Sequence, residues 1–177
     1  MYKTILFDFD GTVFDTGEGI MKSVQYAAES FGFSEPDYRA LRSFVGPPLR
    51  ESFMRRYGVD TVTAEAMTAK YRERYSKEGL TECSVYPGVP ELVRKLRASG
   101  RKAVVATGKP TKFTVDILEQ HGLSSLFDDV LGSEFDGTRS QKWEVIAELL
   151  DRFGGRDAVM VGDRDNDVLG AKKCGIP

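Results

Sequence analysis

The second half of the chain alternates short apolar runs with amphipathic segments, and a further apolar run lies near the start. Four runs are rich in β-branched or small apolar residues and are bounded by polar or turn residues, which is typical of buried strands. These runs are residues 4–7, 103–106, 129–132 and 158–161. Apolar residues at three- and four-residue spacing predict helices at 92–96, 113–118, 143–153 and 168–173. Such alternation favours a parallel sheet with right-handed crossovers.

Residues 17–86 have a different pattern, because helical spacing continues there without a convincing strand. The spacing predicts four helices, at 20–31, 36–44, 49–57 and 63–77. Glycine and proline residues separate them, as expected at helix ends. We therefore expect an α/β fold. Its core is a Rossmann-like, doubly wound parallel sheet formed by residues 1–16 and 87–177, and its inserted domain, residues 17–86, is all-helical.

The composition is ordinary for a soluble globular protein, with 41% hydrophobic and 29% charged residues among 177. A net charge of −2 gives no sign of a nucleic-acid-binding surface. No apolar run approaches membrane-spanning length, and the N-terminal run is too short for a signal peptide. Cys83 and Cys174 match no metal-ligand spacing and are interpreted as thiols in a reducing compartment. We expect a cytoplasmic protein without nucleic-acid or membrane partners.

Two aspartates interrupt the first predicted strand where it ends. Asp8 and Asp10 flank Phe9, and at the two-residue period of a strand they point to the same face. A buried carboxylate is costly unless it is hydrogen-bonded, paired or metal-bound. Gly11 follows and allows a sharp turn. A solvated Asp-Gly turn is the simplest interpretation, but the position directly after an apolar strand favours a functional site.

Polar groups also follow two later strands, at the sheet edge where ligands of parallel sheets bind. Thr107 and Gly108 precede a predicted helix, whose N-terminus favours an anion. Lys142 opens the next helix, where its charge opposes the helix dipole unless it meets a negative partner. The alternatives are an N-cap and turn at Thr107 and a solvated surface lysine at Lys142. Lys109 and Arg139 are further candidates for contacting an anion.

Three acids follow the last predicted strand within five residues, namely Asp163, Asp165 and Asp167. Such a cluster repels itself without a cation. A calcium loop of the EF-hand type does not fit, because no glutamate follows at the required distance and a strand precedes the acids.

Together, the four segments resemble the motifs of the haloacid dehalogenase (HAD) superfamily, most of whose members are Mg²⁺-dependent phosphatases. Asp-x-Asp-Gly-Thr at 8–12, Thr107, Lys142 and Gly-Asp-x-x-x-Asp at 162–167 follow predicted strands in the family's order. The resemblance covers essentially the whole chain, and the helical insert corresponds to a small cap domain. The likeness is closest to the phosphoglycolate phosphatase-like branch, including the loop at 44–49. Relatives usually continue through another strand and helix.

The resemblance implies a catalytic role for four residues. Asp8 is the nucleophile and Asp10 the general acid and base, while Thr107 and Lys142 are catalytic through the phosphate they hold. Asp8 and the backbone of Gly11 also belong to the phosphate-binding set.

The same resemblance implies further ligands. Gly108 contributes a backbone N–H to the phosphate, and Arg50 is a candidate contact for a substrate anion, with a plain surface role as the alternative. Mg²⁺ is bound by Asp8, the backbone carbonyl of Asp10 and Asp163, with Asp167 further from the ion. Asp165 is expected to be exposed.

The expected activity is hydrolysis of a small phosphorylated metabolite through an aspartyl-phosphate on Asp8, by a monomer or weak homodimer. A 5′-nucleotidase-type or a sugar-phosphate mutase activity is the alternative within the family. Dehalogenation is disfavoured because relatives that attack carbon lack the aspartate at position 10, and phosphonate cleavage because only Lys22 is available in the first insert helix. The alternative of another class is a receiver-like phosphoacceptor domain, which lacks a large helical insert after the first strand.

Overall fold

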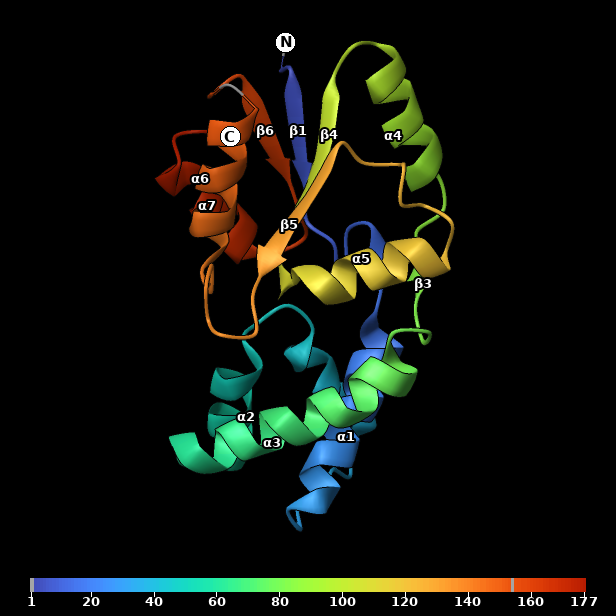
Figure 1. Ribbon diagram of the computed structural model, residues 1–177. Coiled ribbons are helices and arrows are strands. Elements are labelled where there is room, and N and C mark those ends of the chain that lie inside the picture. The colour runs from blue at the N-terminus through green and yellow to red at the C-terminus, as the bar shows by residue number, and fades with distance from the viewer. Residues whose placement is uncertain (1, 154) are drawn as a thin grey trace. The chain divides into compact units, whose positions relative to one another are not determined.

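The computed structural model describes residues 2–153 and 155–177, and these form two compact units (Figure 1). The first unit, the core, runs up to Phe14 and resumes with Val85–Pro177. The second unit, the insert, is Asp15–Ser84. The borders proposed from the sequence, at 16/17 and 86/87, lie two residues from this division.

The core contains a parallel sheet in the order β5-β4-β1-β6. Its strands are β1 (Thr4–Phe7), β4 (Lys102–Pro110), β5 (Asp129–Ser133) and β6 (Ala158–Val161). β1 pairs on one side with β4 and on the other with β6, so that Phe7 lies opposite Val105 and Val161. All four residues of β1 are buried, as their continuous apolar run predicts for a central strand.

Helices cover both faces of this sheet, which confirms the doubly wound α/β fold (Figure 1). The helices are α4 (Val89–Ala98), α5 (Thr111–Gln120), α6 (Lys142–Arg152) and α7 (Asp165–Lys173). Leu6 of β1 and Val104 of β4 pack in one buried cluster with Ile146 of α6 and Ala171 of α7. Figure 1 shows α4 and α5 on the opposite side of the sheet from α6 and α7.

Two core elements differ from the sequence-based expectation. β4 extends four residues beyond the predicted end at 106, and its pairing with β5 shifts register between Ala106 and Pro110. The sequence did not predict this extension, because Gly108 and Pro110 are typical of turns. Leu92 in α4 is 48% exposed although it was expected to face the core. Because adjacent helical residues point about 100° apart, the helix that buries Val93 completely turns Leu92 outward.

The insert is mainly helical, in agreement with its spacing pattern. It contains α1 (Gly17–Ser30), the 3₁₀ helix η1 (Tyr38–Phe44), α2 (Leu49–Tyr57), α3 (Thr61–Arg74) and the π-helical turn η2 (Tyr75–Gly79). Asp60 caps α3 by accepting a hydrogen bond from the Thr63 backbone at 2.8 Å, so this helix begins two residues earlier than predicted. Short strands β2 (Phe14–Asp15) and β3 (Ser84–Val85) pair at the border of the units, where no strand was predicted at 84–85.

A partly buried carboxylate joins three parts of the insert. Glu82, which follows η2, accepts hydrogen bonds from Arg74 of α3 at 2.8 and 3.0 Å and from Lys22 of α1 at 2.9 Å. Hydrogen bonds from Arg74 and Lys22 outweigh the effect of burial and lower the pKa of Glu82. Among the described residues, no helix is both long and apolar enough to cross a lipid bilayer.

Candidate active site

The ends of β1, β4 and β6 and the start of α6 bring the sequence-predicted acids and lysine together. Asp8 directly follows β1 and is 6% exposed, and Asp10 is 7% exposed. The Asp8 backbone N–H donates to Val161 at the end of β6 over 2.8 Å, which extends the pairing of these strands by one residue. Asp8 is therefore held in place at the carboxyl edge of the sheet.

Lys142 is the charge partner of these acids. Its Nζ lies 2.6 Å from Asp8 Oδ1, 2.7 Å from Asp167 Oδ1 and 3.1 Å from the Ala106 carbonyl oxygen. The contacts with Asp8 and Ala106 are hydrogen bonds, and the contact with Asp167 is an ion pair. Lys142 is the first residue of α6, and reciprocal hydrogen bonds between Gln141 and Glu144 fix the start of that helix.

The Asp8 carboxylate is electrostatically destabilised despite this lysine. Burial raises its pKa most, Lys142 lowers it, and Asp167 and Asp10 raise it further, which leaves a pKa of about 6. A carboxylate in such a position gains from any additional positive charge that binds beside it.

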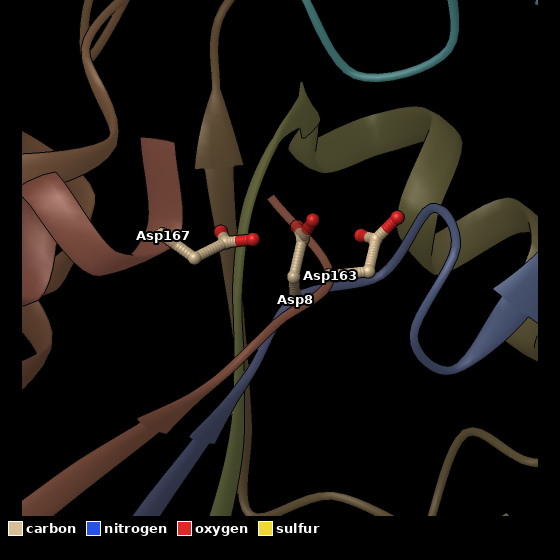
Figure 2. A group of neighbouring side chains, drawn as sticks. All are labelled: Asp8, Asp163 and Asp167. Carbon is tan, nitrogen blue, oxygen red and sulfur yellow. The ribbon is translucent and has the colours of Figure 1, made fainter. Parts of the chain in front are cut away.

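Asp8, Asp163 and Asp167 form an acidic cluster in which one carboxylate oxygen from each lies within 4.8 Å of the others (Figure 2). Carboxylate oxygens are the donors that Mg²⁺ prefers. Since Lys142 already joins Asp8 to Asp167, Asp8 and Asp163 are the two carboxylates best suited to share a cation. Asp167 is 2% exposed and accepts a hydrogen bond from the Arg164 backbone at 3.1 Å, so its carboxylate is held beside Lys142.

Two glycines make room for this cluster. Gly11 has φ +85°, and a Cβ atom there would lie 2.5 Å from Asp163 Oδ2. A Cβ atom on Gly162 would lie 2.2 Å from Asp167 Oδ2. A side chain at either position would displace an acid of the cluster. Asp165 is exposed, as expected.

Asp10 has a different partner, which the sequence did not reveal. Lys109 Nζ lies 3.1 Å from Asp10 Oδ1 and 3.3 Å from Oδ2, and both side chains are buried. Lys109 had been considered only as a contact for an anion. The pair depends on the extended backbone of β4, which buries Thr107 and Lys109 and leaves Gly108 between them exposed.

The remaining candidates have the following surroundings. The Thr107 hydroxyl is buried and accepts a hydrogen bond from the Lys109 backbone at 3.1 Å. The Gly108 carbonyl accepts one from Ser133 at 2.8 Å. Arg139 is bound to protein acceptors. Arg50 belongs to the insert, is exposed and lies 3.4 Å from Glu65, so its contact with substrate stays a prediction.

Comparisons with known proteins agree with the motifs. A family model for haloacid dehalogenase-like hydrolases matches residues 5–177. A 5′-nucleotidase from Pseudomonas aeruginosa is 44% identical over 99% of this chain and 80% of that protein. The crystal structure of a predicted phosphatase from Clostridium acetobutylicum has a TM-score of 0.95 and 42% identity, covering 100% of this chain and 83% of that one.

A further relative carries a different name. The tyrosine-protein kinase PtkA of Mycobacterium tuberculosis is 35% identical over 98% of this chain, which spans 60% of that protein's length. Relatives named phosphoglycolate phosphatase, from Vibrio and Caulobacter species, are 28–29% identical over 98% of the chain.

The family model covers nearly the whole chain, the 44% identical relative is matched over most of its length, and the strand ends carry the motif residues in the expected places. The chain belongs to the haloacid dehalogenase-like hydrolase family.

Proposed function

We propose that this HAD-type phosphatase hydrolyses a small phosphomonoester through an aspartyl-phosphate on Asp8, with Mg²⁺ as cofactor. The observation that carries the proposal is the position of Lys142 Nζ between Asp8 and Asp167, 2.6 and 2.7 Å from their oxygens. This arrangement places one fixed cation beside a buried carboxylate nucleophile. Phosphoryl transfer depends mainly on such positioning and charge stabilisation.

Asp8 and Asp10 divide the chemistry between them. In the first step an Asp8 oxygen attacks phosphorus, the bond from phosphorus to the ester oxygen breaks, and Asp10 gives its proton to the leaving alcohol. In the second step water attacks phosphorus, Asp10 accepts the proton of that water, and Asp8 is released as a carboxylate. Lys109 holds the Asp10 carboxylate at 3.1 Å and so limits its rotation between the two steps.

Asp8, the backbone carbonyl of Asp10 and Asp163 would hold Mg²⁺, together with the phosphate and waters. The acidic cluster and its hard oxygen donors fit that ion. Bound Mg²⁺ would offset the negative charge of Asp8 and of the phosphate oxygens. Asp167 would act through Lys142, since the two lie 2.7 Å apart.

Lys142, the Thr107 hydroxyl and the backbone N–H of Gly108 would bind the phosphate oxygens that do not react. The Gly11 backbone N–H, by contrast, already donates to the Phe14 carbonyl at 2.8 Å, so Gly11 is not a phosphate donor in this proposal. Thr107 and Gly108 lie just before α5, and Lys142 begins α6, so two helix N-termini add their favourable partial charge.

The substrate class is a small phosphorylated metabolite. The identity to the P. aeruginosa 5′-nucleotidase, 44%, exceeds that to the phosphoglycolate phosphatases, and this favours a nucleoside monophosphate over phosphoglycolate. A mutase or a receiver-like phosphoacceptor would use the same Asp8 but keep it phosphorylated for longer. We further propose that the protein acts in the cytoplasm as a monomer or weak homodimer.

The test is hydrolysis of p-nitrophenyl phosphate by the full chain in Mg²⁺ and in EDTA, with Asp8→Asn and Asp165→Asn. Turnover that requires Mg²⁺, is lost in Asp8→Asn and survives in Asp165→Asn supports the proposal. Asp165→Asn is the matched control because Asp165 is an exposed acid next to the same cluster. A folded wild-type protein that retains phosphate on Asp8 without turnover would instead support the phosphoacceptor or mutase reading.

A further inference from the structure

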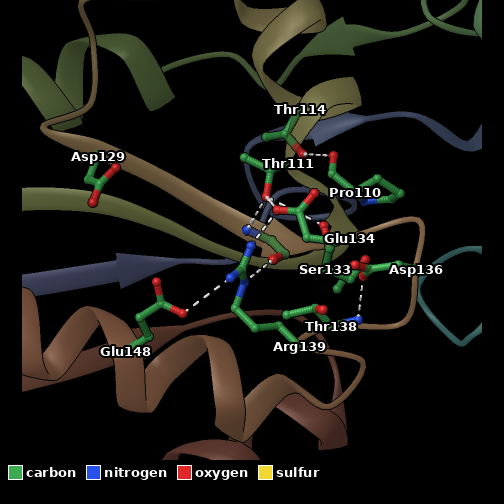
Figure 3. A network of polar contacts seen from close by, with 12 residues as sticks. Pro110, Thr111, Thr114, Asp129, Ser133, Glu134, Asp136, Thr138, Arg139 and Glu148 are labelled. Carbon is green, nitrogen blue, oxygen red and sulfur yellow. Dashed lines mark hydrogen bonds and ion pairs between the residues drawn. The ribbon is translucent and has the colours of Figure 1, made fainter.

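Arg139 is the only described non-glycine residue with a positive φ, at +56°. This left-handed conformation is uncommon for residues with a side chain. Arg139 lies in the loop between β5 and α6, three residues before Lys142. Its side chain is partly buried and points back into the fold (Figure 3).

The Arg139 guanidinium connects three segments. Its Nε donates to the Gly132 carbonyl in β5 at 2.8 Å, its Nη1 to Glu148 in α6 at 3.3 Å, and its Nη2 to Glu134 in the loop. The planar guanidinium group of an arginine donates from three separate nitrogens, so it bridges acceptors that lie farther apart than a single ammonium nitrogen can reach. Glycine would suit the backbone better, so the contacts account for arginine at this position.

Glu134 carries the connection onward to the start of α5, which directly follows β4. The Thr111 hydroxyl at the start of α5 donates to Glu134 at 3.0 Å and accepts from the Gly132 backbone at 3.0 Å (Figure 3). Ser133, next to Glu134, donates to the Gly108 carbonyl at 2.8 Å. The Arg139–Glu134 pair is therefore linked to α5 through Thr111. It is linked to Gly108 through Ser133, the residue next to Glu134.

Glu148 carries the connection to the other side of the phosphate site. It lies in α6, the helix whose first residue is Lys142. Arg152 binds the same Glu148 and reaches Asp129 at the start of β5 at 2.8 Å. Arg152 thus connects α6 to β5, as Arg139 does. Its hydrogen bonds go to Asp129 and Glu148, and not to the 134–140 loop or the start of α5.

We propose that Arg139 and Glu134 form a positioning unit that sets the distance between Gly108 and Lys142 and so shapes the phosphate-binding site. The inference rests on the proposed function, in which both residues bind phosphate oxygens. The Nε, Nη1 and Nη2 atoms of Arg139 all donate to protein acceptors, so Arg139 would position the phosphate-binding residues without contacting phosphate itself. A phosphate oxygen that is bound by both residues requires a fixed distance between Gly108, near the end of β4, and Lys142, at the start of α6.

The experiment compares Arg139→Ala, Arg139→Lys and Arg152→Ala in the full chain with Mg²⁺. Since displacement of a catalytic group by about 1 Å can cost about 100-fold in rate, we expect Arg139→Ala to lower kcat by about 10–100-fold. Arg139→Lys should recover only part of this loss, because an ammonium cannot replace the guanidinium. Arg152→Ala, which removes partly exposed ion pairs from the same helix, should stay within about twofold of wild type.

Two further readouts separate positioning from general destabilisation and from failure of the proposed function. Binding of inorganic phosphate, followed by calorimetry, should weaken in Arg139→Ala and not in Arg152→Ala, whether or not the wild type hydrolyses esters. Thermal unfolding should show similar losses for both alanine variants. Equal effects of Arg139→Ala and Arg152→Ala on kcat and on phosphate binding would overturn the inference, as would no effect of Arg139→Ala. Phosphate binding without hydrolysis by the wild type would reject the proposed activity and leave the positioning unit standing.

Discussion

At the scale of single residues, the acidic cluster places Asp8 where its ionised form destabilises the folded protein. Asp8 is buried, its pKa is raised to about 6, and it lies beside Asp167 and Asp163 with Lys142 as its nearest cation. Among these acids an ionised Asp8 is unfavourable until positive charge is added. Position 8 should therefore tolerate a neutral side chain well when no cation is bound beside it.

We predict that Asp8→Asn raises the melting temperature of the protein in EDTA at pH 8. The substitution keeps the shape of the side chain and removes one of the mutually repelling buried charges, while Lys142 retains Asp167. A gain of 1 kcal/mol corresponds to about 2–4 °C in a domain of this size. Thermal unfolding measures the shift, and added Mg²⁺ should stabilise the wild type more than the variant.

Asp165→Asn is the control for this measurement, since it removes an exposed acid from the same segment. Its melting temperature should change little. A lower melting temperature for Asp8→Asn than for wild type in EDTA would show that the Asp8–Lys142 contact stabilises the fold more than the crowding of acids destabilises it.

Some contacts between site residues could be predicted from the sequence and others could not. Asp8, Lys142, Asp163 and Asp167 could be predicted as neighbours, because the carboxyl ends of parallel strands meet at one edge. The Asp10–Lys109 pair could not, because it depends on β4 remaining extended through a segment with turn composition. That extension is stabilised by pairing with β5, a tertiary interaction that local sequence preference does not contain.

At the scale of elements, the spacing of apolar residues predicted the four core strands and the helices between them, while element ends depended on individual contacts. The 36–44 segment forms a 3₁₀ helix that begins only at Tyr38, where Asp37 accepts a hydrogen bond from the Arg39 backbone. The predicted helix at 63–77 continues instead as a π-helical turn from Tyr75. There Gly19 and Gly79 approach so closely that a Cβ atom on Gly19 would lie 2.2 Å from the Gly79 carbonyl.

One carboxylate holds the start of β4 to the residues before β5. Asp128 accepts a hydrogen bond from the Ala103 backbone at 3.0 Å and lies 3.1 Å from Lys102 Nζ and 3.2 Å from Arg97 Nε at the end of α4. Burial acts to raise its pKa, but the Ala103 hydrogen bond and the two cations outweigh it and lower the pKa. The ionised form of Asp128 therefore stabilises the folded state.

We predict that Asp128→Asn lowers the free energy of unfolding by about 1–2 kcal/mol at pH 7, a modest value because both cations are partly exposed. Since the folded-state pKa lies below the ordinary value of 3.8, the contribution is complete well above that pH and is lost as the pH falls through the folded-state pKa. Urea unfolding of the wild type and variant should show a smaller difference at pH 3 than at pH 7. Asp151→Asn, at an exposed position, is the control, and an equal Asp128→Asn effect at both pH values would contradict the prediction.

At the scale of the whole molecule, helical spacing replaces strand patterning in the segment that forms the insert, Asp15–Ser84. The chemistry of the family is fixed by core residues, whereas the choice of substrate is not contained in the four motifs. Arg50 is the insert residue proposed to contact a substrate anion, with a plain surface role as the alternative. That residue lies at the start of α2, just after the Gly-Pro-Pro loop.

We predict that Arg50→Ala raises KM for a phosphate ester that carries a second anionic group, such as phosphoglycolate, and changes KM for p-nitrophenyl phosphate much less. A charged hydrogen bond lost on binding costs about 1.5–3 kcal/mol, which corresponds to a rise in KM of about tenfold or more. Glu65→Gln is the matched control, because it disrupts the 3.4 Å ion pair of Arg50 and leaves the guanidinium in place. If Arg50 binds the second anionic group of the substrate, Arg50→Ala raises KM for that ester and Glu65→Gln does not. If Arg50 serves only the ion pair with Glu65, the two variants lose the same small amount of stability and keep the same KM for both esters. Substrate choice would then have to come from other residues of the insert.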